Sequence, residues 1–133
     1  MSVKRSVITS PDAPNPGAYY SQAIASGDLL FCSGQIAIDP KTGEMVTGGI
    51  TAETEQVLSN LKAVLAAAGA TLSDVLKTTV YLSDFADFPA MNASYVRAFP
   101  TDPPARATVG VSALPRGAKI ELEAIARLRA PIP

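Results

Sequence analysis

The chain has 133 residues, close to the size of one ordinary domain, and 47% of them are hydrophobic, which suits a packed core. A count of 11 Lys and Arg against 12 Asp and Glu gives a net charge of −1, so neither nucleic acid nor an anionic membrane is favoured as a partner. The chain contains no His, which excludes His-based catalytic triads, HExxH zinc sites and imidazole acid–base catalysis.

Three β-prone segments precede the first predicted helix: Val3–Ile8, Tyr19–Ala25 and Leu29–Ile38. The third contains Gly34, and a glycine inside a strand marks a bulge or a close backbone approach. The single cysteine, Cys32, can form neither an internal disulfide nor a CxxC site. We expect it to be a small buried hydrophobe, because no His is available to lower its pKa.

The strongest local prediction is a helix that follows Gly48 and Gly49. Its apolar residues recur at the spacing of one buried face, and they are Val57, Leu58, Leu61, Val64, Leu65 and Ala68. Gly69 fits the left-handed position just past the end of this helix.

A strand with one apolar face is predicted at residues 76–83, and a second helix follows it. Pro89 lies in the first turn of that helix and Pro100 just past its end. The apolar residues Phe88, Met91 and Tyr95 share one side of it.

Two further strands complete the chain, at residues 105–111 and 119–129. In the first of them alanines and valines alternate with Arg106, Thr108 and Gly110. The expected fold is therefore α+β in the order ββ-α-β-α-ββ, with a mixed sheet and both helices on one of its faces, in a single domain spanning residues 1–133. The other face carries Thr79, Tyr81, Thr108 and Ile125, which favours a second subunit over an open face in water.

Arg106 is the first candidate functional residue, because a guanidinium at a strand start can bind a carboxylate through two hydrogen bonds. Glu121 follows 15 residues later on the last strand. Two strands joined by such a loop can pair, so both side chains could face one site, where Glu121 would position water and move protons. An ordinary cross-strand ion pair is the alternative, and Glu123 is a rival for the role.

Ser33 and Gly34 form a second candidate site, since a ligand can approach the backbone closely at a glycine. A simple β-bulge is the alternative there, and for the amide of Asn92 the alternative is hydrogen bonding on a helix surface. The sequence contains no phosphate-binding loop and no cluster of carboxylates suited to a metal. It also has no apolar run of roughly 18 residues that would span a membrane and no secretory signal, so a cytoplasmic location without a membrane partner is expected.

Six short motifs occur along the chain in a fixed order: Tyr20-Ser21-Gln22-Ala23, Cys32-Ser33-Gly34-Gln35-Ile36, Lys77-Thr78-Thr79-Val80, Met91-Asn92-Ala93-Ser94-Tyr95, Pro104-Ala105-Arg106-Ala107 and residues 119–126 (KIELEAIA). Together they resemble the reactive intermediate deaminase family, also called the RidA or YjgF-type family. The resemblance implies a chorismate-mutase-like fold and a homotrimer with clefts between subunits. It also implies hydrolysis of 2-enamine or 2-imine acids, such as 2-aminoacrylate, to 2-keto acids and ammonia, without a metal or organic cofactor.

The resemblance also assigns roles to individual residues. Arg106 matches the family's carboxylate-binding arginine and Glu121 its water-positioning glutamate. The substrate-binding positions match Tyr20 (with Tyr19 as the alternative), Ser33, Gly34, Asn92 and Thr108. Many relatives have Cys in place of Thr108, where the backbone N–H is expected to make the contact.

Two other functions remain open at this point. A non-catalytic sensor of small keto or amino acids would need Arg106 but not Glu121. Ribonuclease activity has been attributed to some relatives, but the net charge and the absence of His argue against it.

Overall fold

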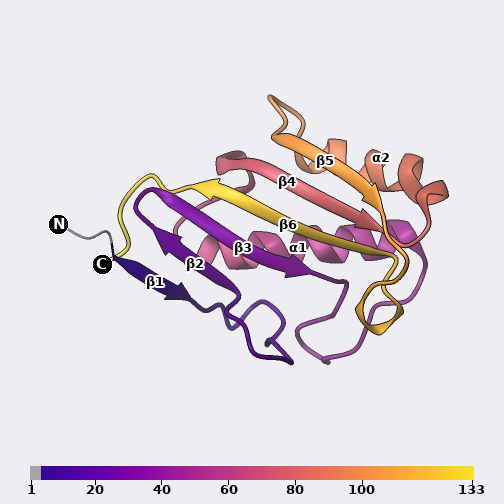
Figure 1. The fold of residues 1–133 in the computed structure, drawn as a ribbon, viewed down its shortest axis with the longest axis horizontal. Coiled ribbons are helices and arrows are strands. Elements are labelled where there is room, and N and C mark those ends of the chain that lie inside the picture. Colours follow the sequence, from indigo (N-terminus) through magenta and orange to yellow (C-terminus); the bar gives the residue numbers. More distant parts are fainter. Residues whose placement is uncertain (1–3) are drawn as a thin grey trace.

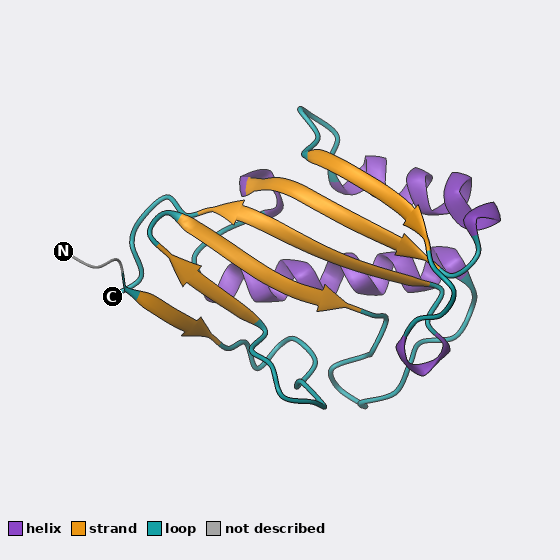
Figure 2. Cartoon of the chain, viewed as in Figure 1, coloured by secondary structure: helices purple, strands orange, loops and turns teal. Residues whose placement is uncertain are grey.

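The structure, a computed structural model, describes residues 4–133 as one mixed sheet of six strands with two helices behind it (Figures 1 and 2). The strands are β1 (Arg5–Ile8), β2 (Ala23–Ser26), β3 (Leu29–Gln35), β4 (Val75–Leu82), β5 (Ala105–Gly110) and β6 (Ile120–Arg127). The helices are α1 (Ile50–Ala67) and α2 (Phe88–Ala98), and short 3-10 turns η1 (Leu72–Asp74), η2 (Phe85–Asp87) and η3 (Pro115–Gly117) join other elements. The α+β fold with both helices on one face is thus confirmed.

The chain order contains one strand more than the expected ββ-α-β-α-ββ, because three strands precede α1. The first β-prone segment forms β1 from Arg5 onward, and its start at Val3 lies outside the described residues. Helix α1 begins after Gly49 and buries the predicted apolar face. Gly69 ends it with a φ of 75°, which lets the Ala70 N–H donate to the Leu65 carbonyl at 2.9 Å.

The strands lie in the order β1-β2-β3-β6-β4-β5, and all neighbours are antiparallel except β4 and β5. That parallel pair arises because α2 carries the chain back across the sheet between the two strands. Strand β5 is therefore an edge strand beside β4. The expected pairing between the strands of Arg106 and Glu121 is wrong, since β4 lies between them.

The register shows which side chains face the helices, because paired residues share a face of the sheet. On β4 and β6 the buried side chains are Thr78, Val80, Leu82, Ile120, Leu122, Ala124 and Ala126. The opposite face is open. At one end it carries an apolar row in which Val7, Ile24, Phe31 and Ile125 lie on four adjacent strands. Val7 and Phe31 are 57% and 45% exposed.

The side chains of β5 face the opposite sides of the sheet from those that the alternation of apolar and polar residues predicts. Arg106 pairs with Thr78 and Thr108 pairs with Val80, so both face the helices, whereas the apolar Ala105 on the same strand is exposed on the open face. The cause lies in α2, whose aromatic rings cover the guanidinium of Arg106.

Candidate functional site

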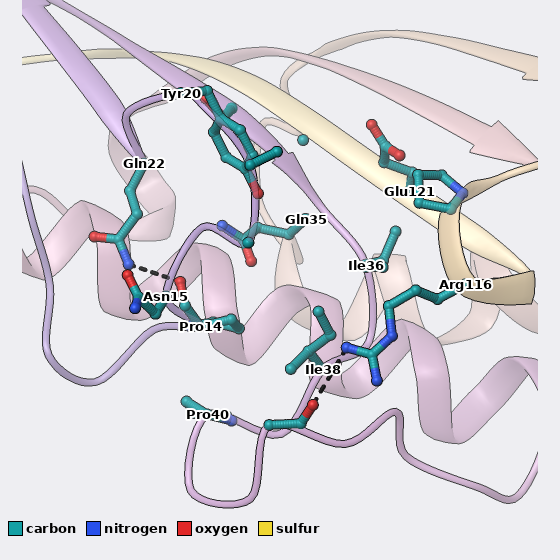
Figure 3. Close-up of a pocket in the computed structure, with 16 residues that line it drawn as sticks. Pro14, Asn15, Tyr20, Gln22, Gln35, Ile36, Ile38, Pro40, Arg116 and Glu121 are labelled. Atoms are coloured by element: carbon teal, nitrogen blue, oxygen red, sulfur yellow. Dashed lines mark hydrogen bonds between the residues drawn. The ribbon is translucent and has the colours of Figure 1, made fainter.

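A pocket of about 700 Å³ opens beside the end of β3 (Figure 3). Three segments form its walls: the loop of residues 14–20, the end of β3 with the residues that follow it, and the turn that contains Arg116. Glu121 enters it from β6, and the lining includes Pro14, Tyr20, Gln22, Ser33, Gly34, Gln35, Ile36, Ile38, Arg116 and Glu121. We call this space the Glu121 pocket.

Gly34 lies against the carboxylate of Glu121. The register between β3 and β6 shifts between Cys32 and Gln35, so the predicted bulge is present. A Cβ on Gly34 would come within 2.9 Å of the Glu121 carboxyl carbon, a separation that real side chains do not adopt. Glycine at this position therefore lets the carboxylate reach the backbone of β3.

The surroundings of Glu121 shift its pKa. Burial raises the pKa of the Glu121 carboxyl, and the neighbouring charge of Glu123 raises it further. The Tyr81 hydroxyl donates a hydrogen bond to Glu123, and this bond is the main reason why the pKa of Tyr81 is also raised. Of the two rival carboxylates, Glu121 lines the pocket, whereas Glu123 lies outside its lining and is bound to Tyr81.

The tyrosine beside this pocket is Tyr20, which lines it and is 51% exposed. Tyr19 is fully exposed and lies outside the lining. Ser33 also lines the pocket, but its hydroxyl donates to the Ser21 carbonyl at 2.6 Å. Its oxygen remains free to accept a hydrogen bond from a ligand.

Most of the other lining residues were not predicted from the sequence, and two of them, Gln22 and Arg116, hold the walls of the pocket in place. The buried amide of Gln22 accepts a hydrogen bond from the Ser10 N–H at 2.6 Å and donates to the Ser10 carbonyl at 3.2 Å. It also donates to the Pro14 carbonyl at 2.9 Å (Figure 3), and these bonds hold the loop that carries Tyr20. Arg116 adopts a φ of 56° and donates to the Gly43 carbonyl at 3.2 Å. The position of Gln22 directly before a strand of buried alanines could have indicated that its amide is buried and hydrogen-bonded. Nothing in the sequence distinguished Arg116.

Arg106, Asn92 and Thr108 form a separate group, which we call the Arg106 cluster. Nη1 of Arg106 donates to Oδ1 of Asn92 at 2.8 Å. Its guanidinium carbon lies 4.6 Å from the ring centroid of Tyr95 and 5.5 Å from that of Phe88. These contacts fix the orientation of the guanidinium plane, so the Arg106 side chain has one defined position instead of moving freely in water.

The hydroxyl of Tyr95 is anchored in turn, at 2.6 Å from that of Thr78. Burial raises the pKa of Tyr95, although the hydrogen bond to Thr78 and the positive charge of Arg106 act in the opposite direction. Tyr95 therefore remains a neutral ring beneath the guanidinium.

The Glu121 pocket and the Arg106 cluster lie on opposite faces of the sheet. Glu121 pairs with Tyr81 on the open face, whereas Arg106 pairs with the buried Thr78 on the helix face. The expectation that both side chains of one chain face one site is therefore wrong. It failed because β4 separates their strands and because Arg106 packs on the rings of α2.

The thiol of Cys32 does not contribute to either group. Burial raises its pKa to about 12, which leaves it protonated and unreactive.

Within residues 4–133 no group of three or more His, Cys, Asp or Glu side chains could hold a metal ion. No helix in the same range is long and apolar enough to cross a membrane.

Comparison with known proteins identifies the family. The family model described as endoribonuclease L-PSP matches residues 10–128, nearly the whole chain. The chain belongs to this RidA/YjgF-type family. It is 54% identical over 122 residues to a RutC family protein of Pyrococcus horikoshii, covering 92% of this chain and 97% of that one. It is 46% identical over 125 residues to a 2-iminobutanoate/2-iminopropanoate deaminase of Dermatophagoides farinae, covering 94% and 97%.

Solved structures of the family share the fold. RidA from an Antarctic Psychrobacter matches with a TM-score of 0.90 and 41% identity over 92% of this chain and 99% of that one. TdcF of E. coli, solved with bound serine, matches with a TM-score of 0.88 and 35% identity over 92% and 98%. Family members named as deaminases support the family's deaminase role.

Proposed function

We propose that this protein hydrolyses reactive 2-imino acids, and the enamines that tautomerise to them, to 2-keto acids and ammonia. The observation that carries the proposal is the chemistry of the two groups. A fixed guanidinium can bind the substrate's carboxylate, and a carboxyl with a raised pKa can exchange protons with water. The names of relatives support the same reaction.

The position of the two groups leads us to propose that the active site forms between subunits. Within one chain the sheet separates Arg106 from Glu121. A second copy that places its Arg106 cluster over the Glu121 pocket would complete the site. A closed ring of three copies, whose subunits meet through the open sheet face with its row of Val7, Ile24, Phe31 and Ile125, would make three equivalent sites and cover that row.

In the proposed mechanism Arg106 binds the carboxylate and thereby orients the imine carbon toward a water held by Glu121. The imine reacts in its protonated form, having taken a proton from solvent. Glu121 accepts a proton from the water as its oxygen bonds to C2 and the C2–N π electrons move to nitrogen, which gives a carbinolamine. Glu121 returns that proton to the amine nitrogen, the hydroxyl oxygen forms the C2–O double bond as the C2–N bond breaks and ammonia leaves, and the hydroxyl proton passes through Glu121 to solvent. Imines of this kind already hydrolyse in water, so positioning and proton transfer supply a sufficient acceleration.

The backbone N–H groups at Gly34 and Thr108 and the amide of Asn92 would bind the substrate's oxygens in this arrangement. Tyr20 would cover the substrate from the side of the loop that Gln22 holds. No cofactor is needed, because the reaction is a hydrolysis without a change of redox state.

A coupled assay tests the proposal. An amino-acid oxidase generates the imine in situ, and the release of ammonia is compared with and without the purified protein. We expect faster release with the wild type and none above background with Arg106→Ala or Glu121→Gln. A protein that binds keto acids without turnover, and whose binding is indifferent to Glu121→Gln, would instead be a sensor. RNA cleavage that is lost in Arg106→Ala would point to a ribonuclease.

A further inference from the structure

The proposed function leaves the substrate's side chain undefined, and two aromatic rings beside the Arg106 cluster bear on it. The rings of Phe85 and Phe88 stack with centroids 5.5 Å apart and an angle of 13° between their planes. Phe88 is the ring that contacts Arg106, and it is half-buried against the core. Phe85 is 51% exposed, so part of its ring surface is open to contact with a ligand.

This stack runs along the edge of the sheet from Arg106 toward Gly110. Arg106, Thr108 and Gly110 share one face of β5 because alternate residues do. The ring of Phe85 lies above Gly110, where a Cβ would be 3.6 Å from Cδ1 of Phe85. The two rings thus flank the position of Thr108, with Phe88 near Arg106 and Phe85 near Gly110.

The distances set a length for the substrate. The guanidinium carbon of Arg106 lies 5.5 Å from the ring centroid of Phe88, which lies 5.5 Å from that of Phe85, so the ring of Phe85 is within about 11 Å of the guanidinium. A 2-imino acid whose side chain is a single methyl group is too short to reach from this guanidinium to the ring of Phe85. A branched or aromatic side chain would extend further along the strand and contact the exposed ring of Phe85.

We propose that the Phe85–Phe88 stack receives the substrate's side chain and that the protein favours 2-imino acids with bulky apolar or aromatic side chains. Phe85 is the specificity-determining residue in this account. A bulky side chain gains apolar contact on the ring, whereas the imine derived from alanine gains none. The inference rests on the proposed deaminase function.

The experiment compares imines generated from leucine, phenylalanine and alanine, using kcat/KM for ammonia release. We expect the wild type to prefer the first two. Phe85→Ala should lower kcat/KM for the leucine- and phenylalanine-derived imines roughly tenfold and that for the alanine-derived imine by less than about twofold. Phe85→Leu, which keeps an apolar side chain, should retain most of the preference for the leucine-derived imine.

The matched control is Val96→Ala, which removes another exposed apolar side chain, from α2, and should change none of the three values. Equal losses for all three imines in Phe85→Ala, or a changed molecular mass of that variant, would overturn the inference and assign the ring to folding or assembly. A wild type that hydrolyses all three imines at the same rate would also overturn it, while leaving the deaminase function intact. Absence of turnover with any imine would overturn the proposed function itself.

Discussion

Gly34 on β3 directly faces the carboxylate of Glu121 on β6, with no space between them for a side chain. This relationship explains why a glycine stands inside a strand at that point. The bulge between Cys32 and Gln35 opens the strand, and the missing Cβ lets the carboxylate lie against the backbone. The position of the proposed proton acceptor thus depends on its neighbour across the strands.

Gly34→Ala should therefore inactivate the protein without unfolding it. The added methyl group must displace the Glu121 carboxylate, and a shift of about 1 Å at a reacting group can cost roughly 100-fold in rate. The measurement is kcat for ammonia release, with the melting temperature as a check on folding. Gly17→Ala, in the same pocket but with open space around it, should keep its activity. Equal activity of the two variants would contradict this account of Gly34.

Glu121→Gln should lose at least about 100-fold in kcat, because the neutral amide accepts no proton. The free energy of unfolding of this variant at neutral pH should not fall and should instead equal or exceed that of the wild type. The folded state raises the pKa of Glu121 above its ordinary value of 4.5, so the wild type loses stability as the pH rises from 4.5 through that raised pKa. The variant lacks this loss.

Melting temperatures measured across the pH range check the sign of this effect. Glu121→Gln should be at least as stable as the wild type at pH 7, and its advantage should disappear below about pH 4.5, where both states of the wild type are protonated. An advantage that persists at low pH would show that the cause is packing rather than charge.

Gln22→Glu should loosen the loop that carries Tyr20. The change replaces an N–H donor by an oxygen that faces the carbonyls of Ser10 and Pro14, at a cost of about 1–3 kcal/mol in the free energy of unfolding. We expect KM to rise more than kcat falls, because the loop forms a wall of the pocket and does not touch the reacting bond.

The control for this prediction is Asp74→Asn, at a buried carboxylate that binds Arg129 and Thr71 away from the pocket. It should lower the melting temperature and leave KM unchanged. A similar KM in the Gln22→Glu variant and the wild type would show that the glutamine serves only the fold.

Phe31→Glu should break the assembly. The side chain lies in the apolar row on the open face, and a charge there would be buried without a partner if a second copy covers the row. Light scattering should give a smaller mass than for the wild type, and activity should fall with it. Val96→Glu, a charge introduced on the exposed side of α2, should change neither. An unchanged mass of Phe31→Glu would show that subunits do not meet through this face.

The local elements could be predicted from the sequence because local patterns determine them. Helix α1 follows from the spacing of Val57, Leu61 and Val64, and its end follows from Gly69. The pairing of β5 could not be predicted in the same way, because it depends on where α2 returns the chain. The spacing between Arg106 and Glu121 therefore suggested neighbouring strands, whereas β4 lies between them.

The orientation of Arg106 was also beyond a pattern of apolar and polar residues. Alternation predicts that alanines and valines face the core and that arginine faces water. In the structure Arg106 faces the helices, because Tyr95 and Phe88 offer their ring faces and Asn92 accepts a hydrogen bond. The fold gathers the candidate residues into two groups on opposite faces of the sheet, and this division is a tertiary property that no local pattern contains.

In the proposed assembly one subunit supplies Glu121 and its neighbour supplies Arg106. A mixing experiment decides whether this is so. The Arg106→Ala and Glu121→Gln variants, each inactive alone, are unfolded together in equal amounts and refolded as mixed assemblies. If neighbouring subunits share the site, about a quarter of the sites receive both intact residues and the same fraction of wild-type activity returns. If each chain builds its own site, the mixture stays as inactive as its components, and the account is wrong.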